Sequence, residues 1–145
     1  MRKVVVAGTF DILHLGHLWL LNKAKEHGDR LIVVVSRDES VERIKGRKPV
    51  FPEEERLELV RNLRMVDEAI LGHSMDKLKV IEELRPDVLV LGPDPWKKEE
   101  IEYELKKRGL KVDVVQIENI YSDSKFHRTS QVIDHIIKDY MPARK

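Results

Sequence analysis

The sequence contains no cysteine and no long apolar run, and these two absences exclude several classes of protein. Without cysteine, the chain forms no disulfide, holds no metal through thiolates and has no cysteine nucleophile. No apolar run approaches the length of about 18 residues that marks a transmembrane helix, so no membrane partner is expected. The strand-like pattern begins at Lys3, which leaves no room for a signal peptide, and we expect a cytoplasmic protein.

An excess of charge of one sign is also lacking. The chain has 27 Lys and Arg against 26 Asp and Glu, which gives a formal net charge of +1. The two signs alternate over short distances, as in residues 53–56 and 97–100. A nucleic-acid surface needs a patch of one sign, so we expect no nucleic-acid partner. With 145 residues, of which 41% are hydrophobic, the chain suits a single domain over residues 1–145.

Two widespread phosphate-binding motifs are missing. The pattern Gly-x-x-x-x-Gly-Lys-Ser/Thr does not occur, which excludes a P-loop NTPase. The pattern Gly-x-Gly-x-x-Gly does not follow the first apolar run, which argues against redox chemistry with a dinucleotide. Any function in phosphate chemistry therefore depends on a different motif.

Strand-like and helix-like patterns alternate along the chain. Apolar runs predict strands over residues 3–7, 31–36, 68–71, 87–91 and 112–117. Amphipathic patterns with breakers or caps at their ends predict helices over residues 16–27, 52–63, 76–84, 97–108 and 129–140. Five βα units predict an α/β fold, a single-domain Rossmann-like, doubly wound parallel five-stranded sheet. Ligands of such sheets bind at the carboxyl ends of the strands, where the motifs below lie.

The most informative segment is Gly-Thr-Phe-Asp-Ile-Leu-His-Leu-Gly-His, residues 8–17. It follows the first predicted strand and leads into the first predicted helix. His14 and His17 are three residues apart, so they lie on one face where this helix begins. The free N–H groups and the dipole of a helix N-terminus attract anions. Two imidazoles at that point predict a site for a polyphosphate.

This segment resembles, without a departure, the signature of the nucleotidyltransferase superfamily that carries the His-x-Gly-His motif. The resemblance covers nearly the whole chain and implies the same fold. It implies a reaction in which a substrate phosphate attacks the α-phosphorus of a nucleoside triphosphate and pyrophosphate leaves. It also implies that His14 and His17 are catalytic and contact the triphosphate and the developing charge.

The turn between the first strand and the first helix receives further roles from this resemblance. Thr9 and Phe10 are expected to offer backbone N–H groups and a hydroxyl to the nucleotide. Gly8 and Gly16 are expected to let the backbone approach it closely. Asp11 either holds the turn or helps to hold a metal, and we favour the structural role.

A basic segment, residues 45–49, resembles the one that the superfamily carries between its second strand and second helix. Lys45 is expected to be catalytic and to reach the phosphates of both substrates. Arg56, in the first turns of the helix over 52–63, is expected to bind the acceptor phosphate. The alternative for the segment is a solvated charged loop.

The segment Leu-Gly-Pro-Asp, residues 91–94, borders the base and ribose in the superfamily. Gly92 is expected to give room for the base, and Asp94 to accept a hydrogen bond from the ribose or the base. The alternative is an ordinary Gly-Pro-Asp turn.

The segment His-Arg-Thr-Ser, residues 127–130, resembles the second motif of the superfamily. Arg128, expected to be catalytic, would grip the β- and γ-phosphates together with the hydroxyls of Thr129 and Ser130, at a helix N-terminus that favours anions. The alternative is a plain helix cap at Thr129 or Ser130. The segment departs from the commonest Ile-Ser-Ser/Thr-Thr form, which leaves the hydroxyl partner open.

Residues 31–39, 69–72 and 91–94 resemble those of archaeal FAD synthases. That resemblance implies transfer of AMP from ATP to the phosphate of FMN, giving FAD and pyrophosphate. Pro93 stands where cytidylyltransferases carry a histidine that can read cytosine, which favours ATP over CTP. One alternative is a glycerol-3-phosphate or sugar-phosphate cytidylyltransferase that uses CTP. Another is a nucleotide-binding module without turnover, against which the two intact motifs argue.

Three further expectations concern the binding of the flavin ring, the source of the metal and the oligomeric state. The aromatic residues available to an apolar slot for the ring of FMN are Trp19, Trp96, Tyr121 and Phe126. No spacing of His, Asp and Glu suits a tight metal site, so a divalent metal such as Mg²⁺ is expected to come with ATP. The resemblance implies a homodimer, which the apolar faces of the helices over 52–63 and 76–84 could support.

Overall fold

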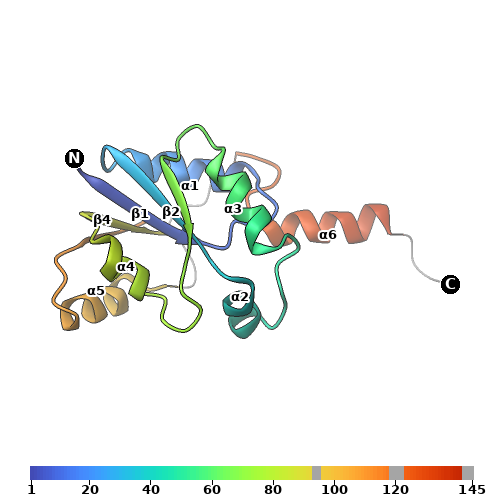
Figure 1. The fold of residues 1–145 in the computed structure, drawn as a ribbon. Coiled ribbons are helices and arrows are strands. Elements are labelled where there is room, and N and C mark those ends of the chain that lie inside the picture. The colour runs from blue at the N-terminus through green and yellow to red at the C-terminus, as the bar shows by residue number, and fades with distance from the viewer. Residues whose placement is uncertain (93–95, 118–122, 142–145) are drawn as a thin grey trace.

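A parallel β-sheet organises the chain in the computed structural model, which describes residues 1–92, 96–117 and 123–141 (Figure 1). Its strands are β1 (Lys3–Gly8), β2 (Arg30–Val35), β3 (Glu68–Leu71), β4 (Val88–Leu91) and β5 (Asp113–Gln116). They lie in the order β3-β2-β1-β4-β5, and all four pairings are parallel. The chain runs outward from β1 in both directions, so the switch point lies between β1 and β4. The predicted doubly wound α/β fold is confirmed.

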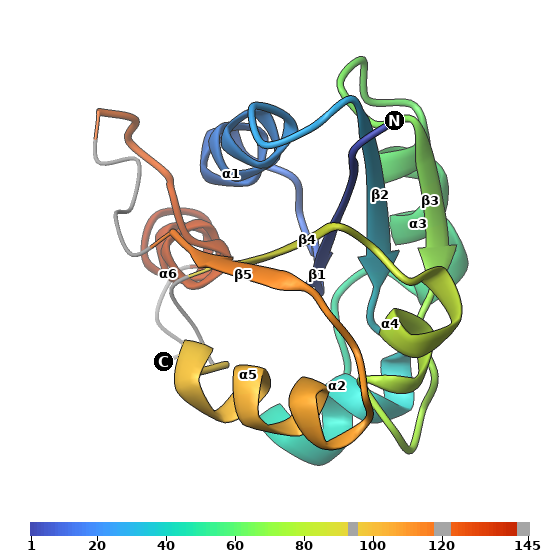
Figure 2. The same ribbon diagram turned by 90° about the vertical axis from the view of Figure 1, so that its left-hand side faces the viewer.

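Helices cover both faces of this sheet (Figures 1 and 2). They are α1 (Leu15–Lys25), α2 (Asp38–Lys45), α3 (Glu53–Arg61), α4 (Lys79–Leu84), α5 (Lys98–Lys107) and α6 (Thr129–Tyr140). The pair α1 and α3 packs on one face, and the pair α4 and α5 packs on the other. In the described part of the chain, no helix combines the length and the apolar character needed to cross a bilayer.

The strands supply both hydrophobic cores because successive side chains point to opposite faces. Val4 and Val6 of β1 join the core beneath α1 and α3, whereas Val5 joins the core beneath α4 and α5. In β2, Val33 joins the core beneath α1 and α3, and Ile32 joins the core beneath α4 and α5. Continuous apolar strands are typical of a parallel sheet covered on both faces. The two cores fix the carboxyl ends of β1, β2 and β4, from which the site is built.

Helix α2 is an element that the sequence analysis missed. Its sequence, Asp-Glu-Ser-Val-Glu-Arg-Ile-Lys, is short, and Val41 and Ile44 are its two apolar residues, which is too little for the apolar pattern to predict a helix. The local signals are instead acidic residues in the first turn, basic residues in the last turn, and Gly46, whose φ of 79° ends the helix. Lys45 therefore lies in the last turn of a helix and not in a loop.

Helix α6 projects from the body of the molecule (Figure 1) and has no buried residue. Its observed bounds equal the predicted ones. The N-cap is Arg128, whereas Thr129 or Ser130 was expected. Gln131 explains this shift, because its Oε1 atom accepts the backbone N–H of Arg128 at 3.1 Å and that of His127 at 2.9 Å. The start of α6 is thus held in place without a hydroxyl cap.

Candidate active site

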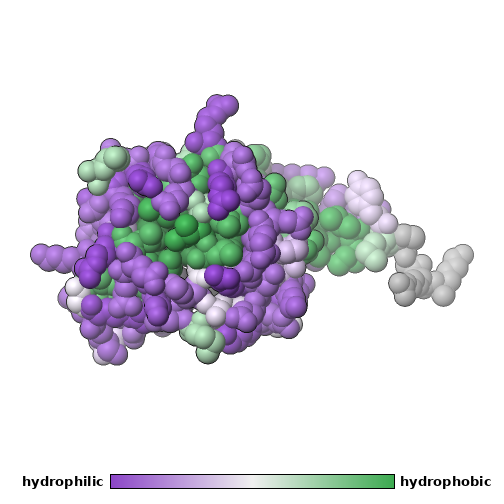
Figure 3. Space-filling model, in the orientation of Figure 1, coloured by the Kyte–Doolittle hydropathy of each residue, from purple (hydrophilic) through white to green (hydrophobic). Residues whose placement is uncertain are grey.

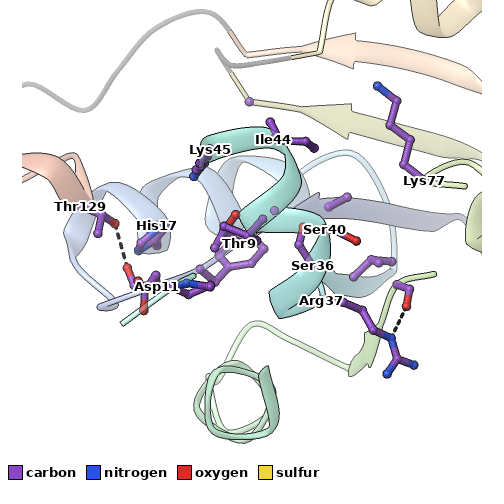
Figure 4. Close-up of a pocket in the computed structure, with 18 of the residues that line it drawn as sticks. Thr9, Asp11, His17, Ser36, Arg37, Ser40, Ile44, Lys45, Lys77 and Thr129 are labelled. Carbon is purple, nitrogen blue, oxygen red and sulfur yellow. Dashed lines mark hydrogen bonds between the residues drawn. The ribbon is translucent and has the colours of Figure 1, made fainter. Parts of the chain in front are cut away.

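An open cavity of about 850 Å³ lies at the carboxyl ends of the strands (Figure 4). The β1–α1 turn, α2 with the loop after it, the loops after β3 and β4, and the start of α6 line it. The residues predicted for the site that line it are Gly8, Thr9, Phe10, His14, Gly16, His17, Lys45, Gly92, Arg128, Thr129 and Ser130. Asp94 lies outside the described residues. The fold thus brings together segments that are more than a hundred residues apart in sequence.

The two histidines of the first motif cap α1. The Nδ1 atom of His14 accepts the backbone N–H of Gly16 at 3.1 Å, and the Nδ1 atom of His17 accepts the backbone N–H of His14 at 3.3 Å. Their rings stack with centroids 3.9 Å apart. Because each Nδ1 atom accepts a hydrogen bond, each neutral ring carries its proton on Nε2. The pair can therefore offer N–H donors without carrying a positive charge.

Burial keeps these rings neutral. Desolvation, followed by the charges of His14 and Lys45, lowers the pKa of His17 to about 3. Desolvation, followed by the charge of His127, also lowers the pKa of His14. At neutral pH lysine and arginine supply positive charge to this region, while the rings of His14 and His17 act as oriented dipoles.

The first and second motifs contact each other directly (Figure 4). The hydroxyl of Thr129 donates to the backbone carbonyl of Asp11 at 2.8 Å, and its oxygen lies 3.4 Å from Nε2 of His14. Since the hydroxyl proton goes to Asp11, the oxygen is placed to accept the Nε2–H of His14. A Cβ atom on Gly16 would lie 2.4 Å from the carbonyl oxygen of His127. Gly16 thus allows the N-termini of α1 and α6 to meet.

Gly8 and Phe10, which both line the cavity, also pack against each other and against the histidine pair. Phe10 is buried, with a φ of 54°, and its ring centroid lies 5.5 Å from that of His17. A Cβ atom on Gly8 would lie 2.9 Å from this ring. The glycine makes room for Phe10, and Phe10 supports one side of the histidine pair.

Asp11 holds the loop that follows α2. Its carboxylate accepts the backbone N–H of Val50 at 2.6 Å and that of Phe51 at 3.0 Å. These two bonds occupy both carboxylate oxygens of a side chain that is almost fully buried. The structural role favoured for Asp11 is the one that the geometry supports, and it ties the loop after Lys45 to the β1–α1 turn.

Arg56 lies outside the cavity, which corrects the expectation that it binds the acceptor phosphate. Its side chain is 0% exposed. The guanidinium donates to the carbonyl of Thr9 at 2.8 Å, to that of Phe51 at 2.9 Å and to the carboxylate of Asp38 at 2.6 Å. A planar group with several fixed donors suits such bridging. Arg56 therefore joins β1, α2 and the start of α3 beneath the site.

Cations gather at the cavity although the chain is nearly neutral. Those that line it are Arg37, Arg43, Lys45, Arg47, Lys48, Lys77 and Arg128. Among the described residues, the carboxylates that line it are Asp11 and Asp76. Asp76 forms an ion pair with Arg108 at 3.0 Å. Clefts that carry charge of one sign focus the electrostatic field and attract oppositely charged ligands. The cavity is therefore suited to anionic substrates.

Several lining residues were missed by the sequence analysis. Arg43 and Ile44 belong to α2, and recognition of that helix would have placed them beside Lys45. His127 lies in the second motif, next to residues that were singled out, and its charge acts on His14. Lys77 lies in the loop after β3 and carried no sequence signal.

Two of the four aromatic candidates line the cavity. Trp19 of α1 and Trp96, which follows β4, are both part of its wall. Phe126 is not, and its ring lies against that of His135 at 5.3 Å between centroids. Tyr121 lies outside the described residues. Among the side chains that the structure describes, no group of three or more His, Asp or Glu is arranged to hold a metal ion.

Comparison with known proteins decides the family. The model of the cytidylyltransferase-like family matches residues 5–140 of this chain. The chain belongs to the cytidylyltransferase-like family. Within it, an FAD synthase of Aciduliprofundum boonei is 46% identical over 138 residues, which cover 94% of this chain and 91% of that protein. The family resemblance read from residues 8–17 is confirmed.

Solved structures place this cytidylyltransferase-like chain among similar folds. A lipopolysaccharide core biosynthesis protein from Thermoplasma volcanium is 43% identical, with a TM-score of 0.79 over 84% of this chain and 99% of that one. A protein from Archaeoglobus fulgidus is 26% identical, with a TM-score of 0.64 over 88% of this chain and 97% of that one. TmcAL from Thermotoga maritima, 16% identical with a TM-score of 0.70 over 97% of this chain and 51% of that one, shows the shared fold alone.

Proposed function

We propose that this protein is an FMN adenylyltransferase, which transfers AMP from ATP to the phosphate of FMN and releases pyrophosphate. The observation that carries the proposal is the cavity of about 850 Å³, which joins the histidine pair, the start of α6 and the basic end of α2 in one space. Ligand pockets commonly measure about 300–1,000 Å³, so this one lies at the large end of the range that ligand sites occupy. The similarity to the FAD synthase of Aciduliprofundum boonei supports this choice.

The reaction in this proposal needs no covalent enzyme intermediate. A phosphate oxygen of FMN forms a bond to the α-phosphorus of ATP, and the bond from that phosphorus to the oxygen bridging to the β-phosphorus breaks. Pyrophosphate leaves with that oxygen. The protein has to align the two anions and stabilise the negative charge that develops between them.

Each part of the phosphate-binding end has a role in this scheme. His17 donates from Nε2 to an oxygen of the triphosphate, and His14 does the same once its Nε2–H turns from the hydroxyl of Thr129 to the bound substrate. Arg128 and the hydroxyl of Ser130, at the start of α6, bind the β- and γ-phosphates. Lys45 sits close enough to His17 to lower the pKa of that ring, so it can reach both the acceptor phosphate and the α-phosphate. Catalysis then rests on positioning and on electrostatic stabilisation.

We propose that the divalent metal arrives with ATP. Asp11 and Asp76, the carboxylates of the described cavity wall, are engaged with backbone N–H groups and with Arg108. Mg²⁺ usually keeps several waters and binds through substrate phosphates, which needs no dedicated carboxylate cage. When bound, the metal would neutralise part of the triphosphate charge.

A second candidate activity has its own support. The similar protein from Thermoplasma volcanium is named for lipopolysaccharide core biosynthesis, and the family is named for cytidylyl transfer. Transfer of a nucleotide from CTP to glycerol 3-phosphate or to a sugar phosphate is therefore the alternative. Its acceptors are small and polar, so they would leave much of the cavity unfilled.

We also propose that the protein works as a homodimer in the cytoplasm. The structure supports a dimer through α6 more than through α3 or α4, on which the sequence-based expectation rested. Ile136, Ile137 and Tyr140 are exposed on α6, and apolar surface covers much of the projecting helix in Figure 3. Light scattering tests this: wild-type protein should have twice the chain mass, and an Ile136→Asn/Ile137→Asn variant should have the mass of one chain.

A product assay tests the activity. Purified protein with MgCl₂, FMN and ATP should yield FAD and pyrophosphate in equal amounts by chromatography, and CTP in place of ATP should yield far less product. A parallel reaction with glycerol 3-phosphate and CTP should stay without product. Formation of CDP-glycerol and no FAD would replace the proposal with the second candidate. Binding of ATP with no product from either pair would support the non-catalytic alternative.

A further inference from the structure

The end of the cavity away from the histidine pair has exposed apolar walls. Ile44 on α2 and Met75 in the loop after β3 both line the cavity, yet they are 63% and 83% exposed. Single exposed apolar residues are ordinary on protein surfaces. Ile44 and Met75 line the same cavity, so they give it apolar surface in a wall otherwise rich in cations.

Hydrogen bonds hold these two walls together. Ser40 donates from Oγ to the carbonyl of Ser74 at 3.1 Å, and Arg43 also donates to that carbonyl. Arg43 further contacts the sulfur of Met75 at 3.6 Å. Ile44 is the next residue on α2, so the contacts of Arg43 fix Met75 near this end of the helix. The apolar end of the cavity is therefore built from two tied elements.

Trp96 adds an aromatic surface to the same end. Its backbone carbonyl accepts a hydrogen bond from Gln116 at 2.9 Å, and it packs against the core beneath α4 and α5. The amine of Lys77 lies 4.9 Å from the centroid of its ring. Figure 4 shows Lys77 at the opposite side of the cavity from His17 and Thr129, with Ile44 between them.

We propose that this end of the cavity is the subsite for the flat, fused ring system of the acceptor, with Ile44 and Met75 against the ring and Trp96 at its edge. The inference rests on the proposed function and names the residues that would select a flavin. Lys45 follows Ile44 directly, so one turn of α2 serves both the ring and the phosphate of the same acceptor. A polyol phosphate has no apolar face and would leave Ile44 and Met75 in water.

Flavin fluorescence gives the test. FMN should lose fluorescence on binding to wild-type protein in the presence of a non-hydrolysable ATP analogue, which gives its Kd. An Ile44→Gln/Met75→Gln variant should bind FMN at least ten-fold more weakly and should bind the ATP analogue as wild type does. Riboflavin, which lacks the phosphate, should also bind this variant more weakly than it binds wild-type protein, by a similar factor. Ile44→Leu/Met75→Leu should retain wild-type affinity for FMN.

Leu59→Gln is the matched control. Leu59 is 44% exposed on α3 and does not line the cavity, so this variant should bind FMN as wild type does. Lys45→Gln separates the two parts of the acceptor site. This variant should bind FMN more weakly than wild type does, while its affinity for riboflavin should be nearly unchanged. Wild-type protein that forms FAD while the Ile44/Met75 Gln variant keeps full affinity for FMN would overturn the ring subsite alone. Wild-type protein that neither binds FMN nor forms FAD would overturn the proposed function with it.

Discussion

His14 and His17 cap the same helix N-terminus and stack on each other, with ring centroids 3.9 Å apart. Each ring uses Nδ1 to hold the backbone and so keeps its proton on Nε2. A single pair of side chains therefore forms the helix cap and provides two N–H donors. The structural and the functional use of each ring fall on different nitrogen atoms, so substitution can separate them.

A His14→Asn variant should remain folded and lose activity. The amide oxygen of asparagine can accept the N–H of Gly16, and asparagine is a favoured N-cap residue. The donor at the Nε2 position is lost, so kcat/KM should fall about 100- to 1,000-fold, as when an oxyanion donor is removed. His14→Ala should lose similar activity and, in addition, about 1 kcal/mol of stability through loss of the cap. Urea unfolding and steady-state kinetics check both, and wild-type activity in His14→Asn would contradict the assignment.

The pKa of His17 predicts how stability depends on pH. Its pKa is about 3 in the folded protein and about 6.5 in a model peptide. Between these values the unfolded chain binds a proton that the folded chain does not, so stability falls as the pH falls. The loss begins as the pH passes below about 6.5 and approaches a slope of about 1.4 kcal/mol per pH unit. The lowered pKa of His14 acts in the same direction.

Chemical denaturation at pH 7.0, 6.0 and 5.0 measures this dependence. A His17→Gln variant removes the titrating group, and its stability should change less over this range than that of wild type. In a histidine NMR titration, the resonances of His17 should show no inflection near pH 6.5. An inflection near 6.5 would show that the ring is more exposed to water than the structure indicates.

The sequence predicts most of the fold and much of the site because both depend on local patterns. Apolar runs predict the strands, because a short continuous apolar run is typical of a parallel strand that is buried on both faces. The segment from Gly8 to His17 predicts the histidine pair, because two residues that are three apart lie on the same face of a helix. The second motif places Thr129, although its contact with Asp11 depends on how distant parts of the chain pack.

Helix α2 and the role of Arg56 were not predicted, and the two failures have a common physical cause. Helix α2 has two apolar residues, so it depends on Gly46 at its C-terminus and on contacts of Ser40 and Arg43 with the loop after β3. Arg56 looks in sequence like any other arginine in the first turns of a helix. Its role is decided by the carbonyl groups of Thr9 and Phe51, which only the folded chain brings to it.

An Arg56→Met variant should lose stability more than it loses affinity for substrates. The change leaves the part-buried carboxylate of Asp38 and the carbonyls of Thr9 and Phe51 without this donor, which costs up to about 3–5 kcal/mol. Arg61→Met is the control, because Arg61 forms an exposed ion pair with Glu58, worth about 0–1 kcal/mol. Thermal or urea unfolding of both variants measures the difference. A stable Arg56→Met variant with a raised KM for FMN would instead return Arg56 to the acceptor site.

A Gly16→Ala variant tests whether the two motifs must touch. In an isolated helix this change is stabilising, because alanine has the higher helix propensity. Here the added Cβ atom would lie 2.4 Å from the carbonyl of His127, so α1 and the start of α6 have to separate. We expect a loss of about 1–3 kcal/mol, as for other overpacked sites, and a large fall in kcat/KM because Thr129 moves away from His14.

Hydrogen exchange locates the effect of this substitution. Amides at the start of α6 should lose protection in Gly16→Ala, while amides of β1 should keep theirs. Gly92→Ala is the control for stability, because its Cβ atom would meet the side chain of Leu20 at an ordinary 3.5 Å. Unchanged exchange in α6, together with full activity in Gly16→Ala, would mean that the N-termini of α1 and α6 bind the triphosphate without being held against each other.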